Sequence, residues 1–350
     1  MTIETDYIDQ KVRLGVIGAG WFASRRHMPD AMAHPRTLLA AFCRRDAGAR
    51  ETLCKRFEVL PEHAYADYEE MLERESLDAV LIATPNNLHY AQAKAALEQG
   101  LHVLIEKPMT IRSEDADELV SLAKSKNLKL AVAVNPPYWS HCHRIRDVFL
   151  SGAIGELECA ALFWTGNAEY VFGQAPAPEN LPGVVLPTMY RSDPAQNGGG
   201  YFMDGGPHLI SELLFVTGLK VQRVTALMDV TPMDMRVSLS LEMENGALVT
   251  LVSLGDSKSG GRRVRNTFGA SNGTITVDDF AFDTTVLING KEAVTFCEAD
   301  TPPPGTPIGN FVEAILGETE LLSTGEHGAE VVRVIEAAYR SATEGRTIAI

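Results

Sequence analysis

Short apolar runs alternate with helix-type patterns over the first 134 residues. Each run is five to seven residues long and lies between polar or turn-forming residues, as expected for strands buried on both faces of a parallel sheet. A helix expected from Ser113 opens with acidic residues and closes with lysines, which matches the helix dipole. This rhythm predicts a doubly wound α/β domain over residues 1–134. Its strands are expected at Val12–Ile17, Leu38–Cys43, Leu77–Ala83, Leu101–Ile105 and Leu128–Val134.

The pattern changes after Asn135. Many β-branched segments separated by turns follow, and Glu244-Asn245-Gly246 suits a tight hairpin turn between two of them. We therefore predict a second α+β domain over residues 135–350, built around an open, mostly antiparallel sheet, with terminal helices that can pack back on the first domain. Strands are expected at Val221–Val230, Met235–Met243, Ala247–Leu254, Arg262–Ala270 and Gly273–Val277, and helices at Arg144–Leu150, Ile308–Leu316 and Glu326–Arg340.

Composition and charge narrow the class of protein. A chain of 350 residues with 45% hydrophobic and 22% charged residues is typical of a globular protein with two domains. The formal net charge of −15 argues against binding to nucleic acid or to an anionic membrane. Residues 1–10 lack the pattern of a secretory signal, and no apolar stretch suits a membrane span. The five cysteines form no C-x-x-C pair, so we expect reduced thiols in a cytoplasm.

A glycine-rich loop follows the first predicted strand. Gly18 permits a tight turn, Gly20 lets a pyrophosphate approach the backbone, and Ala23 allows a helix to pack closely on the strand. Free N–H groups at the start of that helix would hold the anion. Glycine-rich turns are common, but the position of this one between a strand and a helix predicts a dinucleotide site in a Rossmann-type domain.

The end of the second predicted strand bears on the choice of nucleotide. An NAD site usually has an acidic side chain there for the ribose 2′-hydroxyl, whereas an arginine can hold the 2′-phosphate of NADP. Here Arg44 and Arg45 follow the strand, and Asp46 comes only after them. NADP is therefore the expected cofactor. In the alternative, both arginines are solvated loop charges, Asp46 turns back to the ribose and the cofactor is NAD.

Lys107 stands at the end of the fourth run, between Glu106 and Pro108. Pro108 favours an extended backbone at Lys107, so the amine has a defined direction. The loop at Gly18, the turn at Thr84 and Lys107 follow three strands of one parallel sheet, and they share the edge where α/β enzymes carry their chemistry. Taken alone, Glu106 and Lys107 fit solvated charges in a turn equally well.

A polar motif follows the segment Phe172–Gly200, which is rich in proline and glycine. Pro207 fits the first turn of a helix that runs to about Val216, which places Asp204 just before the helix and His208 in its first turn. There the helix dipole favours a neutral imidazole, as a proton acceptor requires. The alternative is an Asp204 that caps the helix and a His208 on its surface.

In this order and at these separations, the motifs resemble the glucose-fructose oxidoreductase, inositol dehydrogenase and rhizopine catabolism protein family, over essentially the whole chain. The resemblance implies a dinucleotide-binding domain followed by an open-sheet domain for substrate binding and oligomerisation, with the active site between them. Members mostly oxidise or reduce a secondary carbon of a sugar, polyol or inositol, and usually form dimers or tetramers. The motifs are Gly18–Ala23, Thr84-Pro85-Asn86 with His89, Glu106-Lys107-Pro108 and Gly198–His208.

The resemblance also implies roles for single residues. Lys107 would contact the reacting oxygen, Asp204 would orient substrate and base, and His208 would exchange the proton of the hydroxyl group. The substrate would be a small sugar-like molecule, and a homodimer or homotetramer is expected. The residues expected to bind the cofactor are Gly18, Gly20, Trp21, Phe22, Arg44, Arg45, Thr84, Pro85, Asn87, His89, Glu106 and Lys107.

Two departures from the family pattern bear on the substrate. Members often have an acidic residue three positions after the histidine, but Ser211 stands here with Glu212 next to it. An arginine-containing segment of many members is replaced by residues 135–139. The identity of the substrate therefore does not follow from the resemblance. Candidate substrate residues, with packing in the core as the alternative, are Asn135, Tyr138, Trp139, Trp164, Tyr190 and Arg191.

His141-Cys142-His143 is a separate candidate, because alternate histidines can bind a metal ion. No second cluster at ligand spacing accompanies it in the sequence, and alcohol oxidation by a lysine, an aspartate and a histidine requires no metal. We therefore expect no metal.

Three functions fit the sequence. The retained Lys107, Asp204 and His208 favour an NAD(P)-dependent dehydrogenase or reductase acting on a CH–OH group. Some relatives instead hold the nucleotide tightly and use transient oxidation to break a glycosidic bond, and rare relatives are non-enzymatic regulators that bind nucleotide and a partner. A regulator would be expected to have lost the catalytic set.

Overall fold

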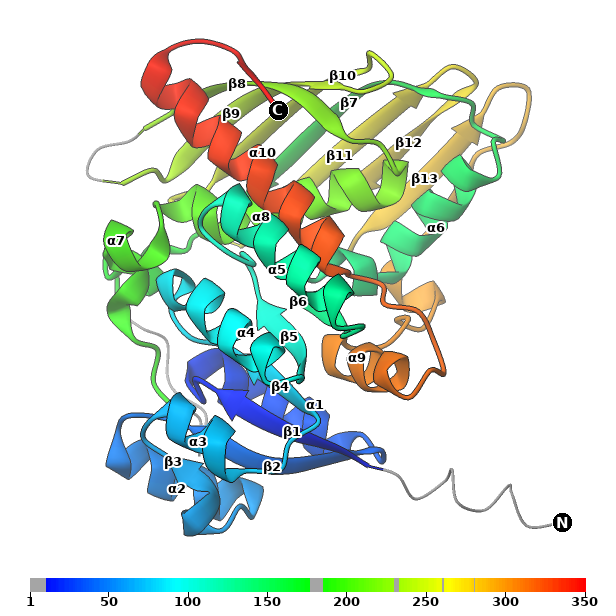
Figure 1. Ribbon diagram of the computed structural model, residues 1–350. Coiled ribbons are helices and arrows are strands. Elements are labelled where there is room, and N and C mark those ends of the chain that lie inside the picture. Colours follow the sequence, from blue (N-terminus) through cyan, green and yellow to red (C-terminus); the bar gives the residue numbers. More distant parts are fainter. Residues whose placement is uncertain (1–10, 177–184, 230–232, 260, 280) are drawn as a thin grey trace, which may run out of the picture.

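The computed structural model describes residues 11–176, 185–229, 233–259, 261–279 and 281–350. Outside the described residues lie residues 1–10, for which we expected no secretory signal, part of the proline-rich segment, and Val230. Two sheets organise the described chain, and Figure 1 shows helices between them. Within the described ranges, no helix is both long and apolar enough to cross a membrane.

The first sheet consists of β1 (Val12–Ile17), β2 (Thr37–Cys43), β3 (Ala64–Tyr65), β4 (Ala79–Ile82), β5 (His102–Glu106) and β6 (Leu130–Ala133). The strands are parallel in the order β3-β2-β1-β4-β5-β6, which confirms the predicted doubly wound sheet. All residues of β4 and β6 are buried, as expected for strands covered on both faces. The order reverses between β1 and β4, so the crevice that binds ligands in such sheets lies at their carboxyl ends.

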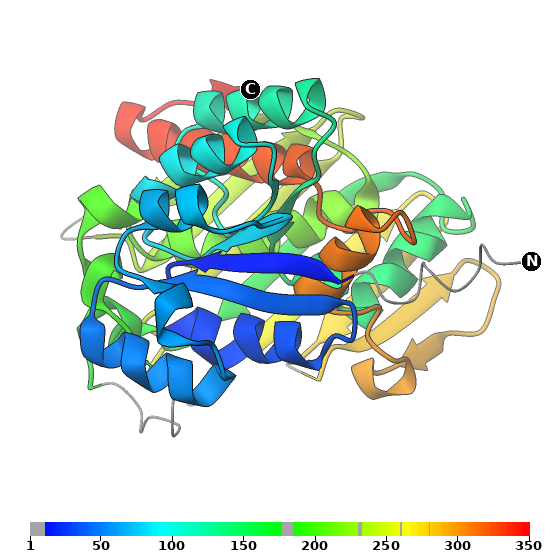
Figure 2. The ribbon, with the colours of Figure 1, turned by 60° about the horizontal axis from the view of Figure 1, so that its bottom comes forward.

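Helices cover both faces of this sheet (Figure 2). One face packs on α1 (Met28–Ala33), α2 (Ala47–Phe57) and α9 (Pro307–Ile315). The other face packs on α3 (Tyr68–Arg74), α4 (His89–Glu98), α5 (Ser113–Ser125) and α10 (Gly325–Glu344). The two faces therefore have separate apolar cores, and both include helices from the end of the chain.

The second sheet consists of β7 (Leu157–Thr165), β8 (Val221–Met228), β9 (Arg236–Met243), β10 (Leu248–Leu254), β11 (Arg263–Ala270), β12 (Gly273–Asp278), β13 (Asp283–Ile288), β14 (Val294–Phe296) and β15 (Ile348–Ala349). Its order is β14-β13-β12-β11-β7-β10-β9-β8-β15. Among the described strands of this sheet, only β7 and β10 pair in parallel, so the prediction of a mostly antiparallel sheet is confirmed. β7, which lies at the centre of the sheet, is not among the strands expected from the sequence.

One face of the second sheet is covered by α6 (Ser140–Leu150), α8 (Tyr201–Thr217) and α10, which share its apolar core. No helix in the described part of the chain covers the opposite face (Figure 1). Burial alternates along β9, where every second residue is exposed over most of its length, as expected for a sheet covered on one side.

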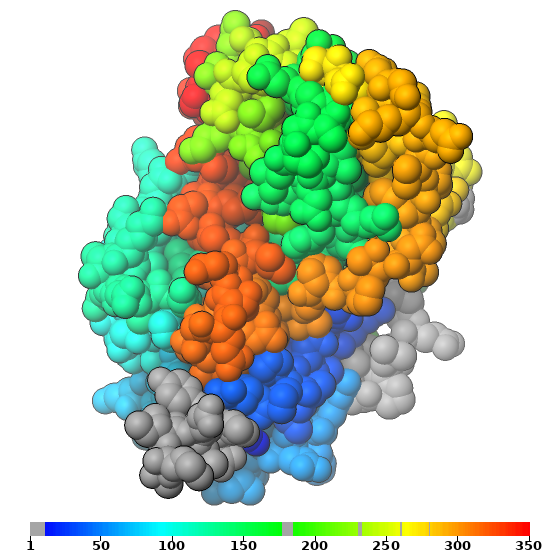
Figure 3. Space-filling model, turned by 90° about the vertical axis from the view of Figure 1, so that its right-hand side faces the viewer, coloured from blue at the N-terminus to red at the C-terminus, as the bar shows by residue number. Residues whose placement is uncertain are grey.

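The last helices connect the two sheets. α10 packs on α5 and β6 as well as on β8, and the Val132 N–H donates a hydrogen bond to the Ser323 carbonyl oxygen (3.1 Å). Figure 3 shows the orange segment around α9 in contact with the blue start of the first domain. The end of the chain therefore fixes how the two sheets lie relative to each other.

Candidate functional site

The chain turns sharply after β1, at the glycine-rich loop. Gly18 has a φ of +86°, and a Cβ added there would lie 2.5 Å from Thr84 Cγ2, so a larger residue does not fit. A Cβ added at Gly20 would approach a guanidinium nitrogen of Arg44 to 3.3 Å. The following helix opens with a π-type turn (Ala23–His27) and continues as α1. The loop therefore leaves bare backbone at the helix start, which suits a phosphate.

Arg44 and Arg45 follow β2, and both line a cleft together with Asp46. The Asp46 carboxylate accepts a hydrogen bond from the Ala49 N–H (2.7 Å), as the N-cap of α2. The Arg50 guanidinium donates to the carbonyl oxygens of Arg44 (2.6 Å) and Arg45 (2.8 Å) and so fixes the backbone of this turn. The acidic side chain of the turn thus has a structural partner on its own helix.

Lys107 follows β5 and reaches the second domain. Its Nζ donates to Oδ1 (2.9 Å) and to the backbone oxygen (2.8 Å) of Asp204 in α8. The Glu106 carboxylate accepts hydrogen bonds from the Lys107 N–H (3.0 Å) and from His27 Nε2 (2.6 Å). Burial opposes ionisation of Glu106, but the hydrogen bond and charge of His27 outweigh it and lower the pKa of the carboxyl group. The backbone that aims the amine is therefore held by a buried carboxylate.

Asp204 binds a second cation. Arg191 Nε donates to the same Oδ1 at 2.9 Å. Burial alone would raise the pKa of Asp204, but the positive charges of Arg191 and Lys107 outweigh burial and hold that pKa well below its usual range. Burial of Arg191 would lower its own pKa, and the charge of Asp204 outweighs that effect and raises it. One ionised carboxylate therefore orients an amine and a guanidinium in the cleft.

The helix that carries these residues begins earlier than predicted. α8 starts at Tyr201, so Asp204 lies in its first turn, Pro207 lies inside it and His208 lies in its second turn. Asp234, from a distant part of the chain, accepts hydrogen bonds from two N–H groups at the helix start, at 2.9 and 2.5 Å. The predicted start was wrong because the residue that caps the helix is remote in sequence.

His208 is close to Lys107 and to two tryptophans. Burial, followed by the positive charge of Lys107, lowers the pKa of His208 to about 3. The imidazole is therefore neutral near pH 7, as expected, but because of burial and a neighbouring amine and not through the helix dipole invoked for it above. The ring stacks with Trp164 and Trp139, at centroid distances of 6.0 and 6.4 Å. Its Nδ1 is buried without a hydrogen-bond partner among the described residues.

These groups line one cleft of about 730 Å³ between the carboxyl edge of the first sheet and the second domain. It brings together most of the residues expected to bind cofactor or substrate: Gly18, Gly20, Trp21, Phe22, Arg44, Arg45, Thr84, Pro85, Glu106, Lys107, Asn135, Trp139, Trp164, Tyr190, Arg191, Asp204 and His208.

Three expected site residues lie outside the lining of the cleft. His89 is fully buried, and its two ring nitrogens lie 2.9 and 3.0 Å from the carbonyl oxygens of Pro108 and Thr84. Tyr138 is buried and donates to Asn310 Oδ1 (3.3 Å). Asn87 is exposed on a short helical turn, and its neighbour lines the cleft instead. His89 and Tyr138 therefore hold the fold around the site, and none of the three residues lines the cleft.

Part of the lining was not expected from the sequence. Residues 66–68 follow the short strand β3, and residues 166–168 follow β7. Arg262, which precedes β11, completes this group. A two-residue strand leaves no periodic signal, but β7 buries Leu157, Ala160, Leu162 and Trp164, and this near-alternation was available in the sequence.

The fold and the cleft are those of a dinucleotide-binding protein, in which the second domain packs against the carboxyl edge of the Rossmann sheet. Comparison with known families gives the same result. Residues 12–134 match the profile of the oxidoreductase family with an NAD-binding Rossmann fold (GFO_IDH_MocA), and residues 142–276 match the GFO/IDH/MocA C-terminal domain. The chain belongs to the GFO/IDH/MocA oxidoreductase family, which confirms the resemblance found in its motifs.

Curated relatives match the chain over different lengths. A dTDP-3,4-didehydro-2,6-dideoxy-alpha-D-glucose 3-reductase of Saccharopolyspora spinosa is 34% identical over 56% of this chain and 53% of the relative. The chain thus spans about half the length of that curated relative. The uncharacterized oxidoreductase YrbE of Bacillus subtilis is 23% identical over 97% of both chains.

Solved structures resemble the whole chain. The WlbA dehydrogenase from Chromobacterium violaceum, in complex with NADH and UDP-GlcNAcA, has a TM-score of 0.83 at 22% identity and covers 98% of this chain and 96% of its own. A levoglucosan dehydrogenase in complex with NADH and L-sorbose has a TM-score of 0.81 at 20% identity, with 97% and 99% covered. At these identities the likeness establishes the fold.

Proposed function

We propose that this protein is an NAD(P)-dependent oxidoreductase that transfers a hydride between the nicotinamide and a secondary alcohol or ketone of a sugar, polyol, inositol or sugar derivative. The observation that carries the proposal is the contact of Lys107 Nζ with Asp204 Oδ1 (2.9 Å) across the two domains. It brings an amine, a carboxylate and an imidazole into the cleft that begins at the glycine-rich loop. Two similar proteins, the dTDP-sugar reductase and the levoglucosan dehydrogenase, are named for sugar substrates, which supports a sugar-like substrate here.

The side chains divide the proton chemistry between them. The nicotinamide, when bound, supplies the acceptor or donor of the hydride. In oxidation, the neutral imidazole of His208 takes the hydroxyl proton while hydride leaves the carbon and the C–O bond becomes a carbonyl. Lys107 donates a hydrogen bond to the reacting oxygen and stabilises the negative charge that develops on it. Asp204 orients the amine, and reduction follows the same steps in reverse.

A screen of hydride transfer tests this proposal. Sugars, polyols, inositols, sugar acids, nucleotide-linked sugars and their keto forms are incubated with oxidised or reduced nucleotide, and the absorbance of the reduced nicotinamide is followed. We expect Lys107→Met and His208→Asn each to lower kcat/KM by about 10²- to 10⁴-fold. Lys55→Met, which removes an exposed lysine paired with Glu51, is the matched control and should keep full activity.

Two outcomes would contradict the proposal. Hydride transfer that persists in both active-site variants would show that the reaction uses other groups. Release of a leaving group from a glycoside, without net change in reduced nicotinamide, would instead identify a hydrolase that uses transient oxidation.

For the cofactor, we propose a preference for NADP over NAD. Arg44 and Arg45 line the cleft directly after β2, and both are charges that can hold a 2′-phosphate. Asp46, the acidic alternative, already accepts a hydrogen bond as the N-cap of α2 (2.7 Å). The guanidinium of Arg44 also lies next to Gly20, beside the loop expected to hold the pyrophosphate.

Dissociation constants for NADPH and NADH test the preference. In Arg44→Ser we expect the constant for NADPH to rise about 10- to 100-fold, because a hydrogen bond to a charged group contributes about 1.5–3 kcal/mol. The constant for NADH should change much less. Tighter binding of NADH than NADPH by the unmodified protein would refute the preference and assign the ribose to Asp46.

We also propose that residues 1–134 bind the nucleotide and residues 135–350 bind substrate and form a homodimer or homotetramer through the open face of the second sheet. Exposed apolar side chains on its strands, Phe163, Leu227 and Leu248, support this surface. Light scattering after size-exclusion chromatography tests the oligomeric state, and a monomer would contradict it.

The five free thiols support a location in a reducing cytoplasm.

A further inference from the structure

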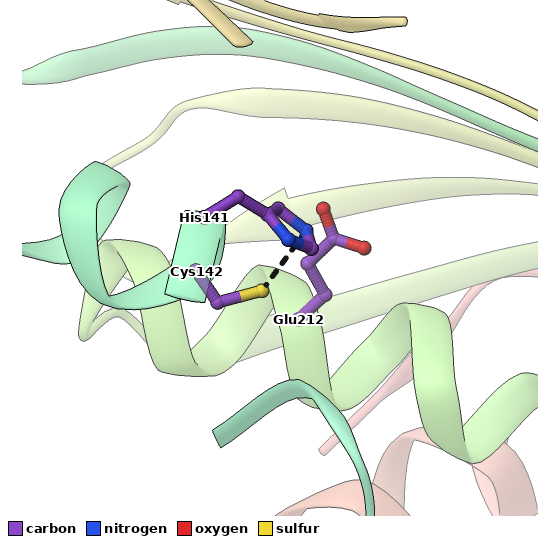
Figure 4. Close-up of side chains that lie close together, drawn as sticks. All are labelled: His141, Cys142 and Glu212. Atoms are coloured by element: carbon purple, nitrogen blue, oxygen red, sulfur yellow. Dashed lines mark hydrogen bonds between the residues drawn. The ribbon is translucent and has the colours of Figure 1, made fainter. Parts of the chain in front are cut away.

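A second group of polar side chains lies inside the second domain, apart from the cleft. His141 and Cys142 come from the first turn of α6, Glu212 comes from α8, and all three are fully buried. Their nitrogen, sulfur and oxygen atoms lie within 4.8 Å of one another (Figure 4). None of the three lines the cleft. We call them the His-Cys-Glu cluster.

The imidazole of His141 is fixed by Glu298 on one side and faces the Cys142 thiol on the other. The Glu298 carboxylate accepts hydrogen bonds from the N–H groups of Ser140 (2.8 Å) and His141 (3.0 Å), and His141 Nδ1 lies 2.8 Å from it. Since this carboxylate is an acceptor, Nδ1 carries the hydrogen, and Nε2 presents a lone pair at 3.3 Å from Cys142 Sγ. A carboxylate on the remote ring nitrogen is the usual support of a metal-bound histidine.

Glu212 has one oxygen with a partner and one without. Its Oε1 accepts a hydrogen bond from Asn266 Nδ2 (2.7 Å), which fixes the carboxylate. Its Oε2 is buried and has no hydrogen-bond partner within the described residues. Figure 4 shows the carboxylate beside the imidazole of His141. A buried carboxylate oxygen without a partner calls for an explanation, and a bound cation supplies one.

We propose that the His-Cys-Glu cluster is a buried binding site for a divalent transition metal ion, with zinc as the expected occupant. With a metal ion bound, Cys142 as a thiolate and Glu212 as a carboxylate would together carry two negative charges and the imidazole none, so a divalent ion leaves the three ligands neutral in sum. A mixed set of nitrogen, sulfur and oxygen ligands suits zinc. A water molecule or another small ligand would complete four-coordination.

The distances in the cluster are close to those of a zinc site. Zinc lies about 2.0–2.3 Å from such ligands, so neighbouring ligand atoms in a tetrahedron are about 3.3–3.8 Å apart. The separation between His141 Nε2 and Cys142 Sγ is already 3.3 Å. Movement of about 1 Å by the Glu212 side chain brings the remaining pairs, which lie within 4.8 Å, into this range.

The site would connect two helices behind the cleft. His141 and Cys142 belong to α6, whereas Glu212 lies one turn beyond His208 on α8. A metal ion there would hold α6 against the helix that carries Asp204 and His208. We expected no metal because the sequence has no second cluster at ligand spacing, but the third ligand of this site is a single residue on a helix some 70 residues later.

Metal analysis of the full-length protein tests the proposal. The protein is produced in medium supplemented with zinc and dialysed, and its metal content per chain is measured by inductively coupled plasma mass spectrometry. We expect about one zinc ion per chain. Cys142→Ser should lose more than about nine tenths of the metal, whereas Cys159→Ser, which removes an exposed thiol outside the cluster, should keep it.

A second variant covers the case in which Cys142→Ser does not fold. Glu212→Gln keeps the acceptor for Asn266 and fits the same space, so it should fold and lose the metal. Refolding of the unmodified protein with cobalt should give a thiolate-to-cobalt absorption band in the near ultraviolet, which Glu212→Gln should lack or weaken. Absence of metal in the unmodified protein, or equal metal content in Glu212→Gln, would overturn the proposal and leave a hydrogen-bonded cluster with a neutral Glu212.

Discussion

Replacing Asp204 by asparagine tests whether one carboxylate holds the two cations of the cleft. The change keeps the size of the side chain but removes its negative charge, while Lys107 and Arg191 stay in place. Both cations lie 2.9 Å from Asp204 Oδ1, and their side chains are only 12% and 15% exposed. The variant therefore leaves two largely buried positive charges without the carboxylate that both of them contact.

The expected loss follows from these distances. At an effective dielectric constant near 20, each pair attracts by about 6 kcal/mol, and desolvation of the charges offsets much of this. Removing one partner of a buried ion pair costs about 3–5 kcal/mol, and the open side of the cleft favours the lower end. We expect Asp204→Asn to lower the free energy of unfolding by about 3 kcal/mol at pH 7. Urea unfolding followed by tryptophan fluorescence measures it.

The matched control is Asp256→Asn, which breaks a two-point contact with Arg236 on the surface. The Arg236 side chain is 60% exposed, so we expect a loss of at most about 1 kcal/mol. Adding Lys107→Met to Asp204→Asn should recover part of the stability, because it removes one of the two unpaired cations. Equal losses in Asp204→Asn and Asp256→Asn would refute the argument.

The sign of the pH dependence gives an independent check. The pKa of Asp204 is lower in the folded chain than in the unfolded chain, where an aspartate titrates near about 3.9. Its stabilising effect is therefore fully present above that pH and is lost as the pH falls through the folded pKa. The difference between the unmodified protein and Asp204→Asn should be constant from about pH 6 to 9, and a difference that grows with pH in this range contradicts the assignment.

Two further predictions concern the imidazole and the glycine-rich loop. The pKa of His208 is lowered to about 3 in the folded protein, against about 6.5 in the unfolded chain. Between these two pH values the unfolded chain binds more protons than the folded protein. The stabilising effect is therefore fully present above about pH 6.5 and is lost as the pH falls toward the folded pKa. Unfolding free energies from pH 7 to 4 should fall less steeply in His208→Asn, and kcat/KM for oxidation should show no limb near pH 6.5. Gly18→Ala places a Cβ 2.5 Å from Thr84 Cγ2 at a φ of +86°. It should therefore lower the free energy of unfolding by more than about 1 kcal/mol, and fluorescence titration should show nucleotide binding at least about tenfold weaker. Unchanged nucleotide binding would contradict the role of this loop.

The sequence predicted those site residues whose positions are set by a single strand and the turn that follows it. Gly18 and Lys107 each follow a buried apolar run, and parallel strands place such ends at one edge. The start of α8 was missed because Asp234, more than 20 residues beyond Pro207, caps it. The neutral state of His208 was expected for the wrong reason, since burial is visible only once the domains are packed together.

Residues that follow two neighbouring strands of the first sheet make contacts with the second domain. Asn86, in the turn after β4, donates to the carbonyl and side-chain oxygens of Asn197 in the second domain, at 2.9 and 3.0 Å. Lys107 makes the corresponding contact with Asp204 after β5. The ends of two neighbouring strands therefore contact the first turn of α8 and the segment just before it. Since catalysis depends on near-ångström placement of reacting groups, these contacts set the geometry that the amine and the imidazole of His208 require.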